Sequence, residues 1–241
     1  MSAKLGIIAA LPFEVASFAG MDIAPDSYEI ISEDSFIYYA GVGAKNATQA
    51  AQFLIDSKVD ALVSWGSAGA LDPVLIPGDI VLPVNVINYV DKKQYRVNER
   101  WHAALKTKLD INTTYSAGSI VSTQDVQHSP QKKTNLYQAI EAAAVDMESA
   151  AIAAVASKEK KPFIVIRSIS DTAAMQLPKS AINGTDEYGR VSIIALFAGL
   201  MKNPTELFHY PRLIHSLAKT KKSLRGIVRL CGFDLCINEV L

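Results

Sequence analysis

The chain has 241 residues, of which 49% are hydrophobic and 20% charged, and its formal net charge is zero when histidine is neutral. This composition is typical of a globular protein and excludes a disordered chain. The zero net charge offers no electrostatic basis for binding nucleic acid, so no such partner is expected. A chain of this length buries roughly 70–75% of its unfolded-state surface, and we expect one domain spanning residues 1–241.

Few residues could bind a metal. The two cysteines, Cys231 and Cys236, indicate free thiols in a reducing compartment, and the four histidines are scattered at positions 102, 128, 209 and 215. We therefore expect no metal site and no cofactor. The N-terminal run "MSAKLGIIAALPFEV" is too short to span a bilayer and lacks a cleavage region, which indicates a cytoplasmic protein.

Apolar runs that suit buried strands alternate with segments of helical periodicity. This alternation predicts an α/β fold with a mostly parallel or mixed sheet. The expected strands are 4–11, 35–43, 59–71 (ending in a Gly/Ser turn), 78–90 (interrupted by Pro83), 114–123 and 161–170. The expected helices are 45–58, 98–109, 131–141, 147–158, 186–202, 204–209 and 211–230.

Four turns are candidates for a ligand site, because ligands in such sheets bind outside the carboxyl ends of the strands. They are "LPFEV", "GVGAKN", "WGSAGALD" and "RSISDTA". Glycines in two of them let backbone N–H groups approach an anion or a hydroxyl-rich ligand. Neither glycine turn matches a P-loop or the dinucleotide-binding spacing.

Carboxylates interrupt apolar sequence in two places. Asp146 and Glu148 lie within "AAAVDMESAAIAAVA" (142–156), and Asp171 directly follows the strand "FIVIRSIS". A buried carboxylate costs several kcal/mol unless it is paired or hydrogen-bonded. Both places therefore suit a functional site. Two simpler interpretations remain open: Asp146 caps a solvent-facing helix start, and Asp171 is a helix N-cap.

Five motifs in this order resemble the nucleoside phosphorylase/nucleosidase superfamily, especially the branch containing methylthioadenosine/S-adenosylhomocysteine nucleosidases. They are "GIIAALPFEV", "GVGAKNATQAA", "GSAGALDPVLIPGDIVL", "AVDMESAAIAAVA" and "VIRSISDTA", and together they cover about residues 4–175. The resemblance implies a three-layer αβα fold with a central mixed, partly barrel-like sheet. It also implies a homodimer or larger assembly.

The resemblance also implies roles in cleaving an N-glycosidic bond. Asp171 matches the general acid that protonates or hydrogen-bonds adenine N7, and Glu14 matches the base that activates water. Glu148 matches the residue that accepts hydrogen bonds from the ribose 2′- and 3′-hydroxyls, and Met147 matches a residue packing on the ribose. Asp146 is expected to point elsewhere and to be structural.

Further substrate-binding residues are expected around these four. Ser67, Gly69 and Ser170 belong to the matching motifs, and Arg167 is expected to orient Asp171 or Glu14. Val126 stands where the nucleosidases usually carry an aromatic residue that stacks on adenine. For Asp125 and Gln127 two interpretations stay open: contact with the base, or ordinary polar loop residues.

The residues near Glu14 favour hydrolysis over phosphorolysis. A phosphorylase must hold a phosphate dianion, usually with an arginine as well as backbone donors. The loop "AALPFEV" contains no arginine, and Ser64 stands where phosphorylases commonly place one. Phosphate is expected as a co-substrate only if the enzyme is a phosphorylase.

A basic helical extension is expected at residues 204–241. The segment 207–233 contains six Lys/Arg and no Asp or Glu, and the sequence after Asp171 resembles the hopanoid-associated phosphorylases, also called adenosylhopane nucleosidases. An amphipathic basic helix suits an anionic membrane surface. The alternative is a helix that simply covers the sheet.

The leading hypothesis is an enzyme that releases adenine from adenosylhopane, a lipid-linked nucleoside, with peripheral membrane contact through the C-terminal helix. The alternatives are a methylthioadenosine/S-adenosylhomocysteine nucleosidase acting on small nucleosides, and a phosphate-dependent purine nucleoside phosphorylase. A non-catalytic nucleoside or lipid binder is a further alternative, which the joint presence of Glu14, Glu148 and Asp171 argues against.

Overall fold

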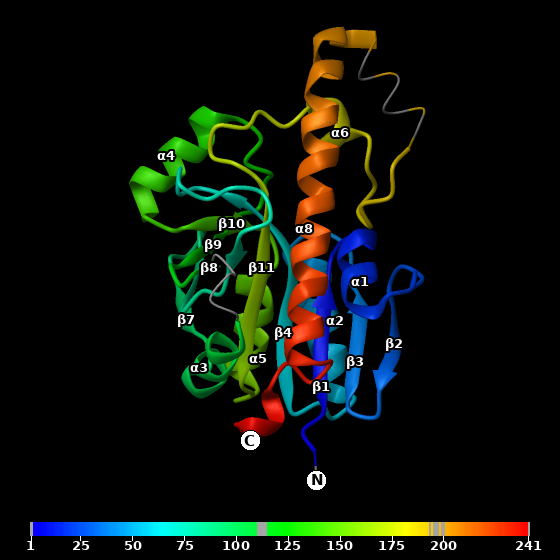
Figure 1. The fold of residues 1–241 in the computed structure, drawn as a ribbon, viewed down its shortest axis with the longest axis vertical. Coiled ribbons are helices and arrows are strands. Elements are labelled where there is room, and N and C mark those ends of the chain that lie inside the picture. The colour runs from blue at the N-terminus through cyan, green and yellow to red at the C-terminus, as the bar shows by residue number, and fades with distance from the viewer. Residues whose placement is uncertain (1, 110–114, 193, 195–197, 199–200, 241) are drawn as a thin grey trace.

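One mixed β-sheet runs through the computed structural model, which describes residues 2–109, 115–192, 194, 198 and 201–240 (Figure 1). Within these residues the sheet has 11 strands. The strands are β1 (Leu5–Ala9), β2 (Ser27–Ser32), β3 (Ser35–Tyr39), β4 (Ala61–Ala70), β5 (Ile80–Val81), β6 (Asn85–Asn88), β7 (Gln94–Arg96), β8 (Tyr115–Ser116), β9 (Ile120–Ser122), β10 (Ala144–Asp146) and β11 (Phe163–Asp171). The helices are α1 (Pro12–Ala19), α2 (Ala44–Asp56), α3 (Glu99–Lys108), α4 (Pro130–Ile140), α5 (Ser149–Lys158), α6 (Lys179–Asn183) and α8 (Tyr210–Cys231), with 3₁₀ turns η1 (Pro204–His209) and η2 (Ile237–Glu239).

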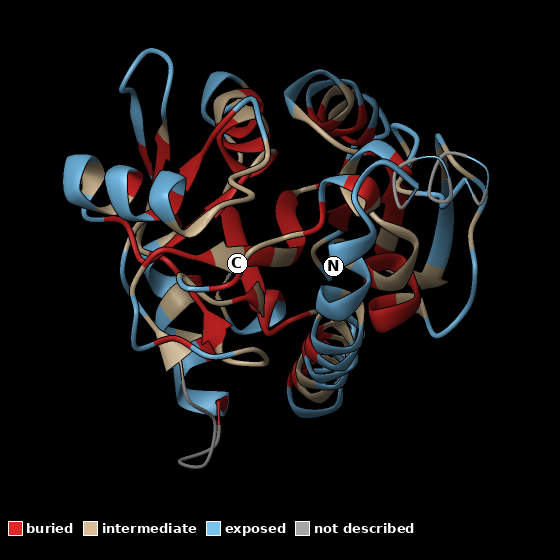
Figure 2. Cartoon of the chain, turned by 90° about the horizontal axis from the view of Figure 1, so that it is seen from above, coloured by how far each residue is buried: buried red, intermediate tan, exposed pale blue. Residues whose placement is uncertain are grey.

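Helices cover both faces of the sheet and give the three layers of the predicted α/β fold (Figures 1 and 2). On one face α2 and α5 pack together through small buried residues such as Ala47, Ala51 and Ala153. On the other face α1, α3 and α8 enclose a second apolar cluster that contains Trp65 and Trp101. The buried residues gather between these helices in Figure 2. Alanine at the α2–α5 contact allows the two helix backbones to approach closely.

Strand β4 joins the parts of the sheet. Ala61–Ser64 pair with β1 in parallel, and Gly69 and Ala70 pair with β10 antiparallel. Along its other edge β4 pairs in parallel with nearly the whole of β11. Ala144 at the start of β10 lies opposite Ala70, and Asp171 at the end of β11 lies opposite Gly69, so β10 and the end of β11 flank the end of β4 on its two edges. Strands in this position are buried on both faces, which explains their continuous apolar sequences.

The predicted strands are confirmed, with one correction and shorter bounds. The sequence predicts that 59–71 ends in a Gly/Ser turn, but β4 continues through Gly66 and Ser67 to Ala70. The backbone stays extended there because β11 pairs with it, with Arg167 opposite Gly66 and Ser168 opposite Ser67. The predicted strand 78–90 is divided at Pro83 into β5 and β6, and 114–123 becomes β8 and β9, with residue 114 outside the described residues.

Two helix predictions need correction. The segment "LPFEV" forms the start of α1 and not merely a turn, since Pro12 suits the first helical position. The helix predicted at 186–202 is wrong for its first residues, where Asp186 accepts the N–H groups of Tyr188 and Arg190 and Thr185 bridges Val191. Positions 194, 198, 201 and 202 are helical, and the remaining residues after 192 in that range lie outside the described part of the chain.

The predicted helix 211–230 is confirmed as α8, which lies along β11 and α1 (Figure 1). Thr220 Oγ1 donates a hydrogen bond to the Ile169 carbonyl at 2.7 Å, and Leu224 and Ile227 are buried against the sheet. The lower part of this basic helix therefore covers the core. Among the described residues, no helix combines the length and apolar character needed to cross a bilayer.

Candidate active site

Polar side chains gather where β4, β10 and β11 end. Asp171 is the last residue of β11, Asp146 the last of β10, and Glu148 immediately precedes α5. Glu14 comes to the same place from the first turn of α1 and contacts Ser67 of β4. All four carboxylates are buried. The expectation that polar groups converge at the carboxyl ends of the strands therefore agrees with the structure.

Glu14 accepts four hydrogen bonds. The backbone N–H groups of Ala10 and Leu11 donate to Oε2 at 3.1 Å each, and the N–H and hydroxyl of Ser67 donate to Oε1 at 2.7 Å each. Its position in the first turn of α1 also places the negative charge at the positive end of the helix dipole. These hydrogen bonds fix the position of the Glu14 carboxylate.

Gly66 makes room for this arrangement. Its φ is +155°, and a Cβ added there would lie 2.5 Å from Arg167 Nη1 and 2.6 Å from the Glu14 carboxylate. A side chain at position 66 would therefore displace one of these two groups. Gly69 is similarly close to Asp171, since an added Cβ would lie 3.0 Å from Asp171 Oδ2.

Arg167 and Asp146 form a buried ion pair. Arg167 Nη2 lies 2.7 Å and Nε 3.0 Å from Asp146 Oδ2, and Nη2 also donates to the hydroxyls of Ser64 and Ser149. Asp146 also accepts from the Ser122 hydroxyl at 2.5 Å. Asp146 therefore points into a structural network, as predicted. Arg167 was expected to orient Asp171 or Glu14, but its hydrogen bonds go to Asp146 and the two serines.

Glu148 accepts the N–H of Gly43 at 2.8 Å, and its Oε2 lies 3.7 Å from Arg167 Nη2. Burial raises the pKa of Glu148 to about 7; Arg167 and the Gly43 N–H oppose this, while the charges of Asp146 and Glu14 add to it. Arg167 therefore contacts Asp146 directly and lies at the limit of ion-pair distance from Glu148, whose burial favours its protonated form. The motif "GVGAKN" contributes by placing Gly43 at the start of α2.

Asp171 pairs with a lysine that the sequence analysis did not identify. Its Oδ2 accepts a hydrogen bond from Lys133 Nζ, and its Oδ1 accepts one from the Ser170 hydroxyl at 2.6 Å. Lys133 has no exposed surface and also donates to the carbonyls of Thr172 and Met175. Asp171 ends a strand and does not begin a helix, so it is not an N-cap.

One signal could have identified Lys133. It stands three residues before Leu136 in α4, and these two are the buried residues of that helix. Side chains three residues apart share a helix face, so the apolar phase of α4 points Lys133 toward the sheet. Met147 and Ser170 are both partly buried beside the carboxylates they adjoin.

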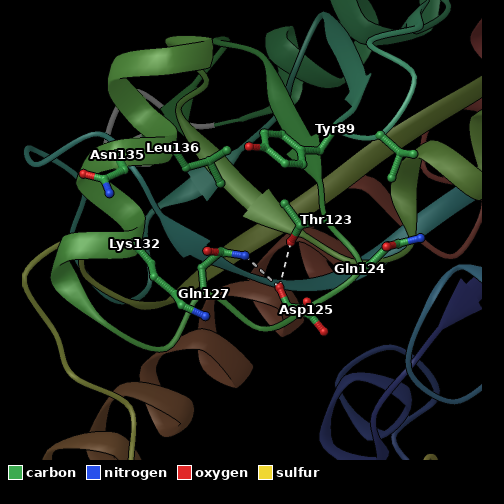
Figure 3. Close-up of a pocket in the computed structure, with 9 residues that line it drawn as sticks. Tyr89, Thr123, Gln124, Asp125, Gln127, Lys132, Asn135 and Leu136 are labelled. Carbon is green, nitrogen blue, oxygen red and sulfur yellow. Dashed lines mark hydrogen bonds between the residues drawn. The ribbon is translucent and has the colours of Figure 1, made fainter.

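The loop between β9 and α4 borders a cavity of about 320 Å³ (Figure 3). Gln127 Nε2 and Thr123 Oγ1 both donate to the carbonyl of Asp125 at 2.9 Å, which holds the loop in a tight turn. Val126 belongs to the same loop but not to the lining set. The lining residues are Tyr89, Val90, Thr123, Gln124, Asp125, Gln127, Lys132, Asn135 and Leu136.

Residues 4–190 match the family model described as "Phosphorylase superfamily". The chain belongs to the phosphorylase superfamily. A 5′-methylthioadenosine/S-adenosylhomocysteine nucleosidase from Buchnera aphidicola is 35% identical over 160 residues, which cover 59% of this chain and 69% of the relative. One from Marinomonas sp. is 28% identical over 207 residues, covering 73% and 89%. The protein is accordingly an enzyme of the nucleosidase and phosphorylase type.

Solved structures share the fold of this superfamily member. The nucleosidase of that name from Colwellia psychrerythraea, in complex with adenine, superimposes with a TM-score of 0.70 at 23% identity, covering 98% of this chain and 95% of the other. The futalosine hydrolase of Helicobacter pylori gives a TM-score of 0.67 at 20% identity, covering 95% and 98%. Identities at this level establish a common fold.

Proposed function

We propose that this enzyme hydrolyses the N-glycosidic bond of an adenine nucleoside such as 5′-methylthioadenosine or S-adenosylhomocysteine. The observation that carries this proposal is the Glu14 carboxylate held by the N–H groups of Ala10, Leu11 and Ser67 and by the Ser67 hydroxyl. The names of the relatives support the same substrates. They favour this alternative over the leading hypothesis of adenosylhopane cleavage.

The geometry around Glu14 argues against phosphorolysis. Backbone N–H groups and a hydroxyl that converge at one point are the groups that usually bind a phosphate. Here a carboxylate takes all four of them, so a phosphate dianion would meet a negative charge in place of free donors. The buried Arg167 is committed to Asp146. A neutral water molecule suits this place, because Glu14 can accept its proton.

Cleavage places positive charge on the ribose and negative charge on the departing base. In the proposed reaction Asp171 donates a proton or hydrogen bond to the base, and Glu14 accepts a proton from the attacking water. Glu148 accepts hydrogen bonds from the two ribose hydroxyls once it is ionised. Ser67 and Ser170 hold Glu14 and Asp171 in place, since each donates its hydroxyl to that carboxylate.

Release of adenine from 5′-methylthioadenosine, measured with and without phosphate, tests this proposal. We expect phosphate-independent release, reduced about 10²–10⁴-fold in Asp171→Asn and in Glu14→Gln, as is usual when an acid or base is removed. Glu99→Gln is the matched control because its carboxylate is exposed on α3. An absolute requirement for phosphate, or full activity in Asp171→Asn, contradicts the proposal.

A lipid-linked nucleoside such as adenosylhopane is a second candidate substrate, favoured by one surface feature. Leu207 and Phe208 in η1 and Ile214 in the second turn of α8 are exposed apolar side chains, and basic residues follow along that helix. The first turns of α8 extend beyond the sheet at the top of Figure 1. Such a combination suits contact with an anionic lipid surface.

Adenine release from adenosylhopane in the same assay tests the second candidate. A preference for it over 5′-methylthioadenosine, together with weaker binding of Phe208→Ser to vesicles containing anionic lipid, supports a lipid substrate. Equal binding of Phe208→Ser and the unmodified enzyme rules out this membrane contact. We choose a point substitution because deletion of residues 211–241 would also remove the buried residues of α8 that pack against the sheet.

A further inference from the structure

Lys133 forms a buried ion pair with Asp171 but has no role in the reaction as proposed above. Lys133 lies in the second turn of α4 with no exposed surface, and Asp171 is 5% exposed at the end of β11. The lysine ammonium also donates to the carbonyls of Thr172 and Met175. Its three donors are thus directed at the strand end that bears Asp171 and at the turn that follows.

We propose that Lys133 is a positioning residue for Asp171 and sets the pH range over which Asp171 can donate a proton to the leaving base. This inference rests on the proposed function. An adjacent ammonium favours the charged form of a carboxyl group, while burial alone favours its neutral form. The contact with the ammonium and the burial of Asp171 therefore act in opposite directions, and removal of the ammonium leaves burial unopposed. Lys133 also fixes Oδ2, while Ser170 fixes Oδ1.

Other charged groups at this end of the sheet are engaged elsewhere. Arg167 is paired with Asp146, and Glu14 is held by Ser67 and the backbone. Lys133 is therefore the cation in contact with Asp171 within the described residues. Titratable side chains on the surrounding elements include Glu148 before α5, His128 before α4, Lys132 and Tyr137 on α4, and Lys219 on the face of α8 near Gly78.

The test is the pH dependence of kcat/KM for adenine release from 5′-methylthioadenosine. Lys133→Met and Lys133→Gln remove the charge, and Gln keeps hydrogen-bond donors toward the carbonyls. Both should move the alkaline limb of the profile upward by at least about one pH unit, and Lys133→Arg should leave it in place. Lys158→Met, at an exposed lysine of α5, is the control and should match the unmodified enzyme.

A purely structural lysine would lower kcat at every pH without moving the limb, and that result overturns the inference. It is also overturned if both neutral variants fail to fold, as judged by circular dichroism. If Asp171→Asn loses activity but the alkaline limb of the pH profile does not move in Lys133→Met and Lys133→Gln, the inference about Lys133 fails and the proposed function stands. Absence of adenine release by the unmodified enzyme, or full activity of Asp171→Asn, instead counts against the proposed function.

Infrared spectroscopy gives a readout that does not depend on activity. At pH 7 the Lys133→Met variant should show a protonated-carboxyl band in addition to that of Glu148, which is partly protonated in the unmodified enzyme as well because its pKa is raised to about 7. The additional band should be absent from the double variant Lys133→Met/Asp171→Asn, which assigns it to Asp171. Identical carboxyl bands in the unmodified enzyme and Lys133→Met overturn the inference even if no substrate is found.

Discussion

Arg167 Nη2 and Asp146 Oδ2 lie 2.7 Å apart, and both side chains are almost completely buried. The pair is enclosed by the hydroxyls of Ser64, Ser122 and Ser149. It lies directly beneath the proposed ribose site, since Glu148 is 3.7 Å from the same Nη2. The cation thus serves the fold and the electrostatics of Glu148 together.

Arg167→Met should destabilise the protein by about 3–5 kcal/mol, because Asp146 loses the partner that makes its burial tolerable. Urea unfolding followed by circular dichroism measures this. Arg190→Met is the matched control, since Arg190 pairs with Asp186 on an exposed loop and should change stability by less than about 1 kcal/mol. Equal losses of unfolding free energy in the two variants would mean that the buried pair contributes no more to stability than the exposed pair.

The KM for an adenine nucleoside should fall as pH rises through about 7. The pKa of Glu148 is raised to about 7 by burial, and only its ionised form can accept two ribose hydroxyl hydrogen bonds. Roughly tenfold less ionised Glu148 is present at pH 6 than at pH 8, so KM should differ by about tenfold. Steady-state kinetics across this range, with Glu148→Gln beside it, measures the effect. If the KM of Glu148→Gln varies with pH in the same way as the KM of the unmodified enzyme, Glu148 is not the titrating group.

Glu148→Gln should stabilise the folded protein at pH 8 by about 1–3 kcal/mol relative to the unmodified enzyme. Between the ordinary pKa of 4.5 and the raised value of about 7, the folded state binds more protons than the unfolded state. Stability from this group is therefore full below the unfolded-state pKa and is lost as pH rises through 7. Unfolding free energies at pH 5 and pH 8 measure it, and Glu99→Gln should show no such difference.

Gly66→Ala should lower both stability and activity. The added Cβ would lie 2.5 Å from Arg167 Nη1 and 2.6 Å from Glu14, and overpacking of this kind typically costs 1–3 kcal/mol. Gly226→Ala is the control, because nothing lies within 4 Å of a Cβ there. In the middle of α8 it should stabilise the protein by about 0.5–1 kcal/mol. Similar melting temperatures for the two variants would contradict the crowding at Gly66.

The cysteines should react slowly with iodoacetamide in the folded protein. Burial raises the pKa of the Cys231 thiol to about 12 and raises that of Cys236 as well, and the thiolate is the reactive form. Mass spectrometry after alkylation, with and without guanidinium chloride, should show labelling mainly in the unfolded chain. Rapid labelling of the native protein would show that the C-terminal segment opens readily.

The positions of the carboxylates could be predicted from sequence, but their partners could not. Asp171 and Asp146 each end an apolar strand, and a carboxylate at the end of such a strand suits a ligand site at the edge of the sheet. Glu14 is different, because Ala10 and Leu11 are local partners at the start of α1, whereas Ser67 belongs to β4, which only its pairing with β1 brings alongside. No local pattern encodes that register.

Lys133 is the clearest example of a site residue that the sequence does not reveal. Lysine is rarely buried, so "QKKT" suggests a solvated helix face. Only the three-residue spacing from Lys133 to the buried Leu136 indicates that Lys133 lies on the buried face of α4. The helix predicted from residue 186 is wrong at its start because of another side-chain contact. The Asp186 carboxylate accepts the N–H groups of Tyr188 and Arg190, and the backbone forms a turn there. Side chains that bond to their own backbone compete with helix formation.

The two ends of the chain are packed into the same half of the core. Leu5 and Ile7 of β1 share an apolar cluster with Leu224 and Ile237, and Thr220 is bonded to the backbone of the strand that carries Asp171. The cluster therefore joins segments that are far apart in the sequence, and closing so long a loop has an entropic cost that must be met before the contacts form. The packing of α8 against this cluster and β11, on which the surroundings of Asp171 depend, should thus be among the last contacts to form when the enzyme folds.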